Sequence, residues 1–440
     1  MSWSKGFAAI GFAACAVLTA GAAPLKVMAI GDSLSEEYRF ETVFSAPQST
    51  PLGPSNTENW VQLLSERRSA DVSFGGYEPS MFQYPDFRDG GYEYNFGVPS
   101  FETVTWVDVI NSTLSDFLSG DPERTFRYTT KREIIRQLDE EDIDVVVIFL
   151  GGNDQYGDYD LIFEEPQTPA LLADAVTNIG KIHQFIRNNH SSVPIIICTF
   201  PDIGATQEIS SVYTDPALRV RARQRIADAN AAVVAKAAQL GATVARIDQL
   251  TDRIFDESPF HLNGTVMQYE PHPDNPPDRI FCHDGFHPST MGQALIGNLI
   301  MDAINRATGR SIALFTNREI LGPILGLNPD QPYLAWAGSA GGMTANPDGD
   351  EMQNLVEYVL GTSGTVADSP LVFSGNGALS FPTSTAGLRF ADLKVMESMT
   401  LGNDWAPVPQ GRISVVNGTW SVAPKGTAKN FYRLEATPKP

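Results

Sequence analysis

The chain has 440 residues, of which 42% are hydrophobic, and its 52 acidic and 31 basic residues give a formal net charge of −21 at pH 7. A chain of this length exceeds a single compact core, so we expect two domains, one large and one small. A strongly acidic surface repels nucleic acid and anionic lipid, which excludes both as expected partners.

The first 22 residues predict a cleaved secretory signal peptide. A lysine near the start precedes an apolar stretch that is too short to span a bilayer, and small residues follow at 20–22. Cleavage would remove one lysine and no acidic residue, which changes the formal charge from −21 to −22. No later stretch of the sequence is apolar enough to span a membrane, so we expect a protein secreted to the periplasm or the cell exterior. In that compartment Cys198 and Cys282 either form a disulfide or remain two buried thiols.

Apolar runs and helical patterns alternate over the first 300 residues. The apolar runs, each predicted to be a strand, cover residues 25–30, 92–96, 143–150, 193–200 and 242–247. Helices are predicted at 129–138, 170–189, 216–240 and about 290–307. Thr130 and Glu133 fit a capping box that begins the first of these helices, and Gly241 fits the end of the third. This order predicts an α/β fold in which helices cover both faces of a parallel sheet.

The composition changes near residue 310. Residues 311–345 are rich in Gly, Pro and Ala and are predicted to be a linker. Short β-type runs follow, and Asn417 and Gly418 fit the two-residue type I′ turn of a hairpin. We therefore expect a large domain over residues 24–310 and a small antiparallel β-domain over residues 346–440.

Residues suited to acyl transfer follow the predicted strands. Such a reaction needs a nucleophile, a base, a group that orients the base, and donors for the oxyanion. Ser33 can be the nucleophile, His287 the base and Asp284 the group that orients it. Asn153 offers a side-chain amide to the oxyanion, and backbone N–H groups of Ser33 and of residues 97–100 can complete the hole. The carboxyl ends of parallel strands meet at one edge of a sheet, so we expect these residues to lie together.

Four sequence blocks resemble those of the SGNH hydrolases, also called the GDSL esterase and lipase family. The blocks begin with Gly31-Asp32-Ser33-Leu34 and continue with residues 95–100, 151–154 and 284–288. The resemblance implies a flavodoxin-like, three-layer α/β/α domain with Ser33, Asp284 and His287 as the triad, Asn153 in the oxyanion hole, and no cofactor for catalysis.

One position departs from the family pattern. Ser100 stands where the second block usually has a glycine. A backbone N–H group survives this change, but a serine does not accept every backbone conformation open to glycine. Gly97 is therefore a second candidate for the backbone donor, beside Ser100.

Two insertions are rich in aromatic residues. Residues 74–96 precede the second block, and residues 155–167 directly follow Asn153. Their rings either line the mouth of the site, where they would stack on sugar faces or acyl chains, or cover the edge of the sheet.

The small domain begins with an acidic loop that resembles an EF-hand. The positions that supply oxygen ligands to Ca²⁺ are occupied by Asn346, Asp348, Asp350, Met352, Asn354 and Glu357. Glu351 replaces the usual glycine at position six, and an acidic N-cap before the helix at 351–361 is the alternative interpretation. This segment also resembles the carboxyl-terminal modules of some secreted bacterial polysaccharide-degrading enzymes.

Together these features predict a secreted serine esterase that removes short acyl groups, acetyl first, from a glycan or another small ester. Two other functions stay open: a lipase or arylesterase acting on longer acyl groups, and a non-catalytic glycan-binding surface protein. His283 and His287 also have the spacing of metal ligands, although no third ligand motif accompanies them.

Overall fold

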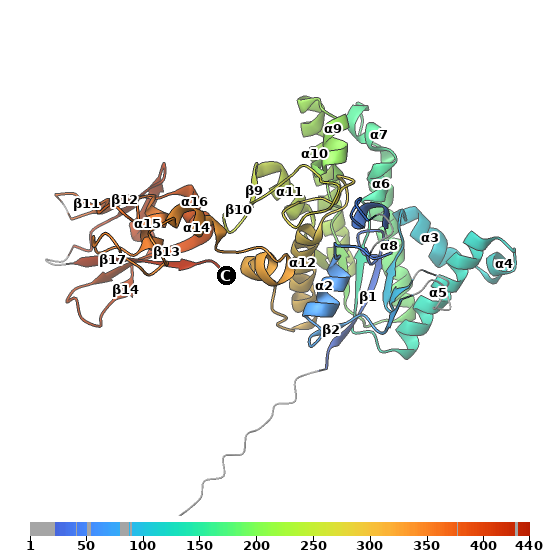
Figure 1. Cartoon of the computed structure of the whole chain (residues 1–440). Coiled ribbons are helices and arrows are strands. Elements are labelled where there is room, and N and C mark those ends of the chain that lie inside the picture. Colours follow the sequence, from blue (N-terminus) through green and yellow to red (C-terminus); the bar gives the residue numbers. More distant parts are fainter. Residues whose placement is uncertain are drawn as a thin grey trace, which may run out of the picture.

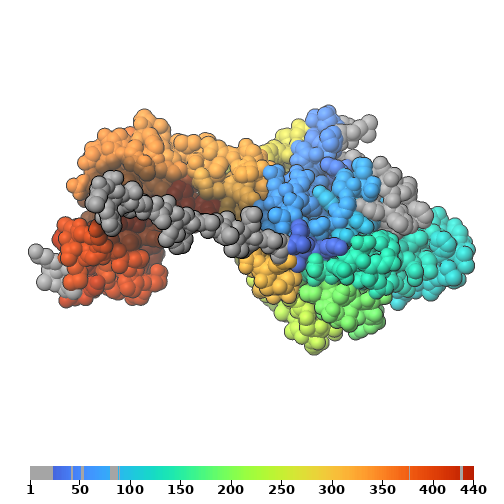
Figure 2. Space-filling model, turned by 90° about the horizontal axis from the view of Figure 1, so that it is seen from below, coloured from blue at the N-terminus to red at the C-terminus, as the bar shows by residue number. Residues whose placement is uncertain are grey.

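The computed structural model describes residues 23–40, 42–50, 54–79, 88, 90–375, 377–426 and 430–440. The predicted signal peptide, residues 1–22, lies outside the described residues. Figure 1 shows an α/β domain followed by a smaller β-rich domain, and Figure 2 shows them as two bodies joined by the segment coloured orange. Within the described ranges, no helix is long and apolar enough to cross a membrane.

The large domain contains a parallel sheet with strand order β2-β1-β6-β7-β8. Its strands are β1 (Leu25–Gly31), β2 (Val72–Ser73), β5 (Asn95–Gly97), β6 (Val145–Phe149), β7 (Ile195–Cys198) and β8 (Thr243–Ala245). Strand β6 pairs with one edge of β1, while β2 and then β5 pair with its other edge. The predicted strands are thus found, except that the run at 92–96 divides between β5 and a short hairpin of β3 (Tyr77–Glu78) with β4 (Gly91–Tyr92).

Helices cover both faces of this sheet. On one face lie α2 (Trp60–Arg67), α11 (Asp248–Asp256) and α12 (Thr290–Thr308), and on the other lie α3 (Thr103–Asn111), α5 (Pro122–Glu140), α8 (Ala170–Asn189) and α10 (Pro216–Leu240). Shorter helices complete the domain: α1 (Thr42–Ser45), α4 (Leu114–Phe117), α6 (Asn153–Tyr156), α7 (Tyr159–Glu164) and α9 (Gln207–Val212). Figure 1 shows α2 and α12 on one side of β1, and α3, α5 and α8 on the other. The three-layer α/β/α architecture is confirmed.

The alternation of side chains along β1 explains why its sequence is apolar throughout. Val27 and Ala29 belong to the core under α2 and α12, whereas Met28 and Ile30 belong to the core under α3, α5, α8 and α10. A strand that is buried on both faces has no polar positions to alternate with apolar ones.

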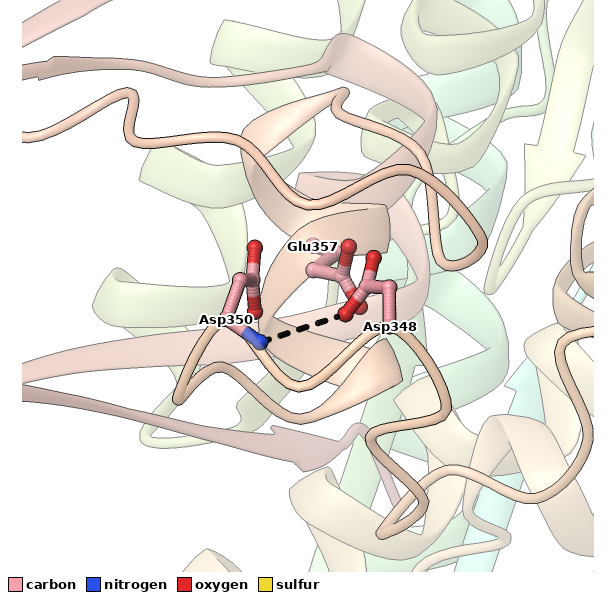
Figure 3. A group of neighbouring side chains, drawn as sticks. All are labelled: Asp348, Asp350 and Glu357. Carbon is pink, nitrogen blue, oxygen red and sulfur yellow. Dashed lines mark hydrogen bonds between the residues drawn. The ribbon is translucent and has the colours of Figure 1, made fainter.

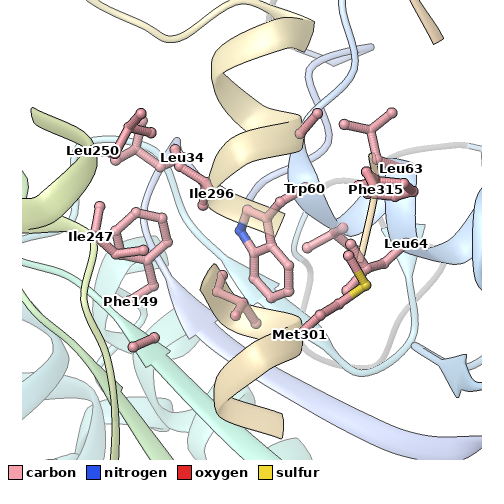
Figure 4. Packing of buried hydrophobic residues seen from close by; sticks show 14 of the residues in the cluster. Leu34, Trp60, Leu63, Leu64, Phe149, Ile247, Leu250, Ile296, Met301 and Phe315 are labelled. Atoms are coloured by element: carbon pink, nitrogen blue, oxygen red, sulfur yellow. The ribbon is translucent and has the colours of Figure 1, made fainter. Parts of the chain in front are cut away.

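Trp60 connects the core under α2 and α12 to the loop that follows β1. Its side chain is fully buried and packs among Ile296, Met301 and other apolar side chains (Figure 4). Its ring meets that of Phe74 edge to face at 5.5 Å, and its Nε1–H donates to Ser35 Oγ at 3.2 Å. A buried indole N–H needs a partner, so this hydrogen bond fixes the loop after β1 against the core.

The prediction for the start of α5 was wrong. The helix begins at Pro122 with Asp121 as its N-cap, and the Asp121 carboxylate accepts hydrogen bonds from the N–H groups of Glu123 and Arg124. Thr130 and Glu133 therefore lie inside the helix instead of capping it. The other long helices have the predicted bounds within two residues, and Gly241 ends α10 in the left-handed conformation with φ 67°.

The small domain consists of antiparallel sheets and short helices. One sheet has the order β11-β12-β16-β15 and another the order β14-β13-β17. The strands are β11 (Val372–Phe373), β12 (Leu379–Pro382), β13 (Ala391–Ser398), β14 (Ala406–Pro407), β15 (Ile413–Val416), β16 (Thr419–Val422) and β17 (Phe431–Pro438), and the helices α15 (Asn354–Leu360) and α16 (Thr385–Phe390) pack beside them. Asn417 and Gly418 both have positive φ between β15 and β16, which confirms the type I′ hairpin turn.

The segment predicted as a linker is divided between the two cores. Ile312, Phe315 and Leu321 pack into the core of the large domain, and α14 (Gln331–Ala337) packs into that of the small domain. A hairpin of β9 (Phe260–Leu262) and β10 (Thr265–Met267) adds a direct link, because the Asn263 amide at its turn donates to backbone oxygens of Lys439 and Pro440 at 3.2 Å.

Candidate active site

Three side chains predicted to act together form a continuous hydrogen-bonded chain. Ser33 Oγ lies 2.8 Å from His287 Nε2, and His287 Nδ1 lies 2.6 Å from Asp284 Oδ2. Both imidazole nitrogens are thus engaged in this chain of contacts. The serine faces the base and the base faces the carboxylate, which is the arrangement that activates a hydroxyl for nucleophilic attack.

The turn after β1 holds Ser33. The Asp32 carbonyl accepts hydrogen bonds from the N–H groups of Ser35 and Glu36, both at 3.0 Å, and Asp32 Oδ1 accepts one from Leu34 at 2.9 Å. A side chain at Gly31 would collide with Ser35, so only glycine allows the chain to fold back so tightly. The apolar strand therefore ends at Gly31 because the next residues form the turn that carries Ser33.

Asp284 and His287 lie on one closed loop in front of α12. Phe281 and Pro288 form an antiparallel bridge across its base, and the Cys282 N–H group donates to the His287 carbonyl at 2.8 Å. Asp284 Oδ1 accepts hydrogen bonds from the backbone N–H groups of Phe286 and His287. Burial opposes the charge of Asp284, but the hydrogen bond and charge of His287 hold the pKa of this carboxyl below its usual value. Asp284 is therefore kept ionised beside the imidazole.

A residue that the sequence analysis missed completes the surroundings of His287. The ring of Phe44, on α1, is stacked on the imidazole with a centroid separation of 3.7 Å and an angle of 3° between the planes. Tyr38 meets the same imidazole edge to face. No local pattern marks Phe44, because α1 has only four residues and the contact joins distant parts of the chain.

Asn153 begins α6 at the carboxyl end of β6. Its Nδ2 group donates to the Phe101 carbonyl at 3.1 Å. An amide NH₂ group has two hydrogens, so the second remains to be donated to a substrate. The next residue, Asp154, accepts hydrogen bonds from the N–H and hydroxyl groups of Thr103, which fixes the loop at 100–103 beside Asn153.

Ser100 adopts the conformation that its glycine-favouring position requires. Its φ is 62°, in the left-handed region, and its side chain is exposed. Gly97 is buried, and a side chain there would collide with the backbone of Glu36. The glycine requirement at 97 therefore comes from close packing, and the one at 100 comes from backbone conformation.

A cavity of about 50 Å³ opens beside Ser33 and Asn153. Apolar side chains make up most of its lining: Leu34, Phe149, Ile203, Ile247, Leu250, Ile254, Ile280, Phe281, Phe286 and Ile296. These residues come from strand β6, helices α11 and α12 and several connecting segments, so no single stretch of sequence indicates the cavity.

The two aromatic insertions have different positions. In the first, Phe74, Tyr94 and Phe96 are buried in the cores, while residues 80–87 and 89 lie outside the described residues. The second forms α6 and α7, and its Tyr156 ring meets that of Phe286, the neighbour of His287, at 4.9 Å. Tyr156 is 46% exposed, so this pair presents aromatic surface next to the triad.

The two cysteines that would remain after signal cleavage are both buried and unpaired. Of the two interpretations left open by the sequence, the structure therefore has the buried thiols. Burial raises the pKa of both thiols, which keeps them in the unreactive protonated form.

The predicted calcium ligands are only partly brought together. Asp348, Asp350 and Glu357 place carboxylate oxygens within 4.8 Å of one another. Asn346 Oδ1 instead accepts a hydrogen bond from the Gly349 N–H group, and the Asn354 amide donates to the carbonyl groups of Ala340 and Gly342. The backbone N–H group of Met352 donates to Asp350 Oδ1. The N-cap of α15 is Gln353, so the acidic residues do not cap this helix.

Comparison with known families agrees with this geometry. Residues 27–300 match the sequence profile of the GDSL-like lipase/acylhydrolase family. The chain belongs to this family. It is therefore a hydrolase of carboxylic esters, and its family needs no cofactor for the reaction. No curated protein is similar enough in sequence to count as a relative.

Solved structures that are similar to this chain include proteins named as lipases and as carbohydrate esterases. A GDSL-like lipase from Parabacteroides merdae has 12% sequence identity, a TM-score of 0.34, and coverage of 65% of this chain and 96% of its own. A family 3 carbohydrate esterase from Clostridium thermocellum has 14% identity, a TM-score of 0.32, and coverage of 65% and 98%. An extracellular lipase from Streptomyces rimosus has 14% identity, a TM-score of 0.34, and coverage of 64% and 100%. Similarity this low does not distinguish between these substrates.

Proposed function

We propose that this GDSL hydrolase removes short acyl groups, acetyl first, through an acyl-enzyme on Ser33. Ser33 Oγ attacks the ester carbonyl carbon while His287 accepts the hydroxyl proton, and His287 then gives that proton to the departing alcohol. Water attacks the acyl-enzyme with His287 as the base, releasing the carboxylic acid and restoring Ser33. The single observation that carries this proposal is the hydrogen-bonded chain from Ser33 through His287 to Asp284.

The oxyanion that forms in both steps needs donors. The second hydrogen of the Asn153 amide and backbone N–H groups at Ser33 and at Ser100 or Gly97 serve this purpose in our proposal. The bond from Asn153 to the Phe101 carbonyl supports it, because an amide that is already oriented loses little freedom when it binds the transition state.

The size of the cavity supports a short acyl group. Its volume of about 50 Å³ is several times the minimum that holds one water molecule, and its lining offers few polar partners. A methyl or ethyl group fits such a space, whereas a long acyl chain would have to leave through the opening. The apolar lining also suits a lipase, which is why the acyl preference has to be measured.

We propose that the alcohol component of the ester substrate is a neutral glycan. The exposed ring of Tyr156, supported by Phe286, offers a flat apolar face on which a sugar can stack beside the triad. The formal charge of −21 repels polyanionic polysaccharides, which favours uncharged acetylated ones.

Secretion is part of the proposal and is supported by the composition of residues 1–22. Expression in a bacterial host would test it, with a mature protein beginning near residue 23 as the expected result.

The test of function is hydrolysis of nitrophenyl esters from acetate to octanoate, followed by acetate release from acetylated polysaccharide. The expected result is highest turnover on acetate and at least a thousandfold loss in Ser33→Ala. Wild-type turnover in Ser33→Ala would refute the nucleophile, and a maximum at octanoate would identify a lipase. If no ester is hydrolysed but glycan binding persists in Ser33→Ala, the protein is a binding module.

A further inference from the structure

Three carboxylates of the small domain face one another. Asp348 and Asp350 lie on the loop that precedes α15, and Glu357 lies on α15 itself (Figure 3). Their oxygens lie within 4.8 Å of one another, although like charges repel at such distances. The arrangement is therefore unfavourable unless something between the carboxylates neutralises their charge.

Glu357 is the carboxylate of this cluster that most requires a compensating positive charge. Its side chain is 0% exposed, and neither of its carboxylate oxygens has a hydrogen-bond partner among the described residues. Asp348 Oδ2 and Asp368 Oδ1 are likewise buried without a partner within that part of the chain. A buried carboxylate without a donor is strongly destabilising in the absence of a compensating charge.

We propose that Asp348, Asp350 and Glu357, joined by Asp368, bind a Ca²⁺ ion. The available ligands are all oxygen atoms, which hard cations prefer. Among the residues that the structure describes, the cluster includes no sulfur or imidazole ligand of the kind that Zn²⁺ favours. Ca²⁺ accepts six to eight oxygens in irregular geometry, whereas Mg²⁺ demands a near-ideal octahedron.

This ligand set differs from the EF-hand pattern in the sequence. The side chains of Asn346 and Asn354 bind backbone groups, and Asp368 enters from a segment that follows α15. The backbone N–H group of Asp368 donates to Asp350 Oδ2 at 3.2 Å, which holds this segment against the loop. The ion would therefore connect three segments: the loop at 348–350, helix α15, and the segment around Asp368 that leads from α15 to β11.

The ion would stabilise the small domain rather than take part in catalysis. Helix α15 contributes Val356, Val359 and Leu360 to the core of that domain, whereas Ser33 and His287 belong to the large domain. Neutralising Glu357 would remove charge repulsion at the edge of this core. The proposal is independent of the esterase function.

The test uses the full chain, stripped with EDTA and titrated with CaCl₂ by calorimetry. The expected result is one site per chain with a dissociation constant at or below about 1 mM, weaker binding of MgCl₂, and a higher unfolding temperature in Ca²⁺ than in EDTA. Binding of Mg²⁺ as strong as that of Ca²⁺ would overturn the calcium assignment, and absence of binding at millimolar Ca²⁺ would overturn the site.

The variants are Glu357→Gln and Asp350→Asn, with Asp392→Asn as a control that removes an exposed carboxylate of β13 in the same domain. Both site variants should lose at least tenfold in Ca²⁺ affinity, while the control keeps wild-type affinity. Glu357→Gln should also unfold at a higher temperature than the wild type in EDTA, because the repulsion is gone. A rise in unfolding temperature also shows that the variant is folded. A lower unfolding temperature than the wild type in EDTA, or wild-type Ca²⁺ affinity, would refute the proposal.

Discussion

The ring of Phe44 lies parallel to the imidazole of His287, with 3.7 Å between the ring centroids. This stacking covers one face of the proposed catalytic base, while its two nitrogens contact Ser33 Oγ and Asp284 Oδ2. The imidazole is thus held both through its two nitrogens and through the stacking of Phe44 on its face. A base held in this way keeps its orientation when it exchanges a proton.

Replacing Phe44 by leucine is expected to lower kcat about tenfold with little change in KM, because the imidazole loses a contact that orients it but the substrate pocket is preserved. Steady-state hydrolysis of nitrophenyl acetate measures this. Val43→Ala is the control, since Val43 is the neighbouring residue and is 80% exposed. A change in KM alone would show that Phe44 contacts substrate instead.

Replacing Asn153 by alanine should lower kcat by about a hundredfold to a thousandfold, because one oxyanion donor is lost. Asn153→Asp is the matched variant: it keeps the size of the side chain, but a carboxylate cannot donate a hydrogen bond. Its activity should be no higher than that of the alanine variant. An aspartate variant with near wild-type kcat would reject the donor role.

Ser100→Gly should stabilise the protein slightly and leave turnover within about twofold. A non-glycine residue with φ near 60° costs roughly 1 kcal/mol, and the larger folding entropy loss of glycine offsets about half of this. Urea unfolding should therefore show a gain of about 0.5 kcal/mol. Turnover should persist because the proposed donor is a backbone N–H group, so a large loss of kcat would implicate the Ser100 hydroxyl.

The pH dependence of stability should include a contribution from Glu37, which is 2% exposed and accepts a hydrogen bond from the Tyr92 N–H group. Burial raises its pKa from 4.5 to about 7. Between these values the folded state binds more protons than the unfolded state, so this group lowers the free energy of unfolding as the pH rises from 4.5 to 7. At 1.36 kcal/mol per pKa unit the loss is about 3 kcal/mol.

Glu37→Gln should remove this slope, so the variant should become more stable than the wild type as the pH rises to 7.5. Urea unfolding followed by tryptophan fluorescence at pH 5.0 and 7.5 measures the difference. Glu66→Gln, on the exposed face of α2, should follow the wild type at both pH values. Parallel curves for wild type and Glu37→Gln would show that Glu37 is ionised in the folded protein at both pH values.

The predictable parts of this protein are those in which local sequence determines the result. Strand β1 is apolar because both its faces are buried, and Gly31 precedes Ser33 because only glycine fits the turn. The start of α5 was missed because Thr130 and Glu133 imitate a capping box, while Asp121 and Pro122 supply the actual cap. Strand β2 has two residues, too few to show a period.

Contacts between distant segments could not be predicted in the same way. The stacking of Phe44 on His287 depends on the placement of a four-residue helix, and the apolar cavity gathers single residues from many elements. The ligands of the acidic loop could not be predicted fully either. Its EF-hand-like spacing predicts six ligands, all within the single segment 346–357. The structure gathers three of these, and the proposed site adds Asp368 from beyond α15.

The loop closed by Phe281 and Pro288 separates two kinds of contact in the proposed triad. Asp284 and His287 both lie within this loop, so the bond between the base and its carboxylate is local, whereas Ser33 lies on the distant turn after β1. A displacement of this loop would break the contact between Ser33 and His287 and leave the bond between His287 and Asp284 intact. Catalytic competence therefore depends on two contacts that His287 makes outside its own loop, one with Ser33 Oγ and one with the ring of Phe44.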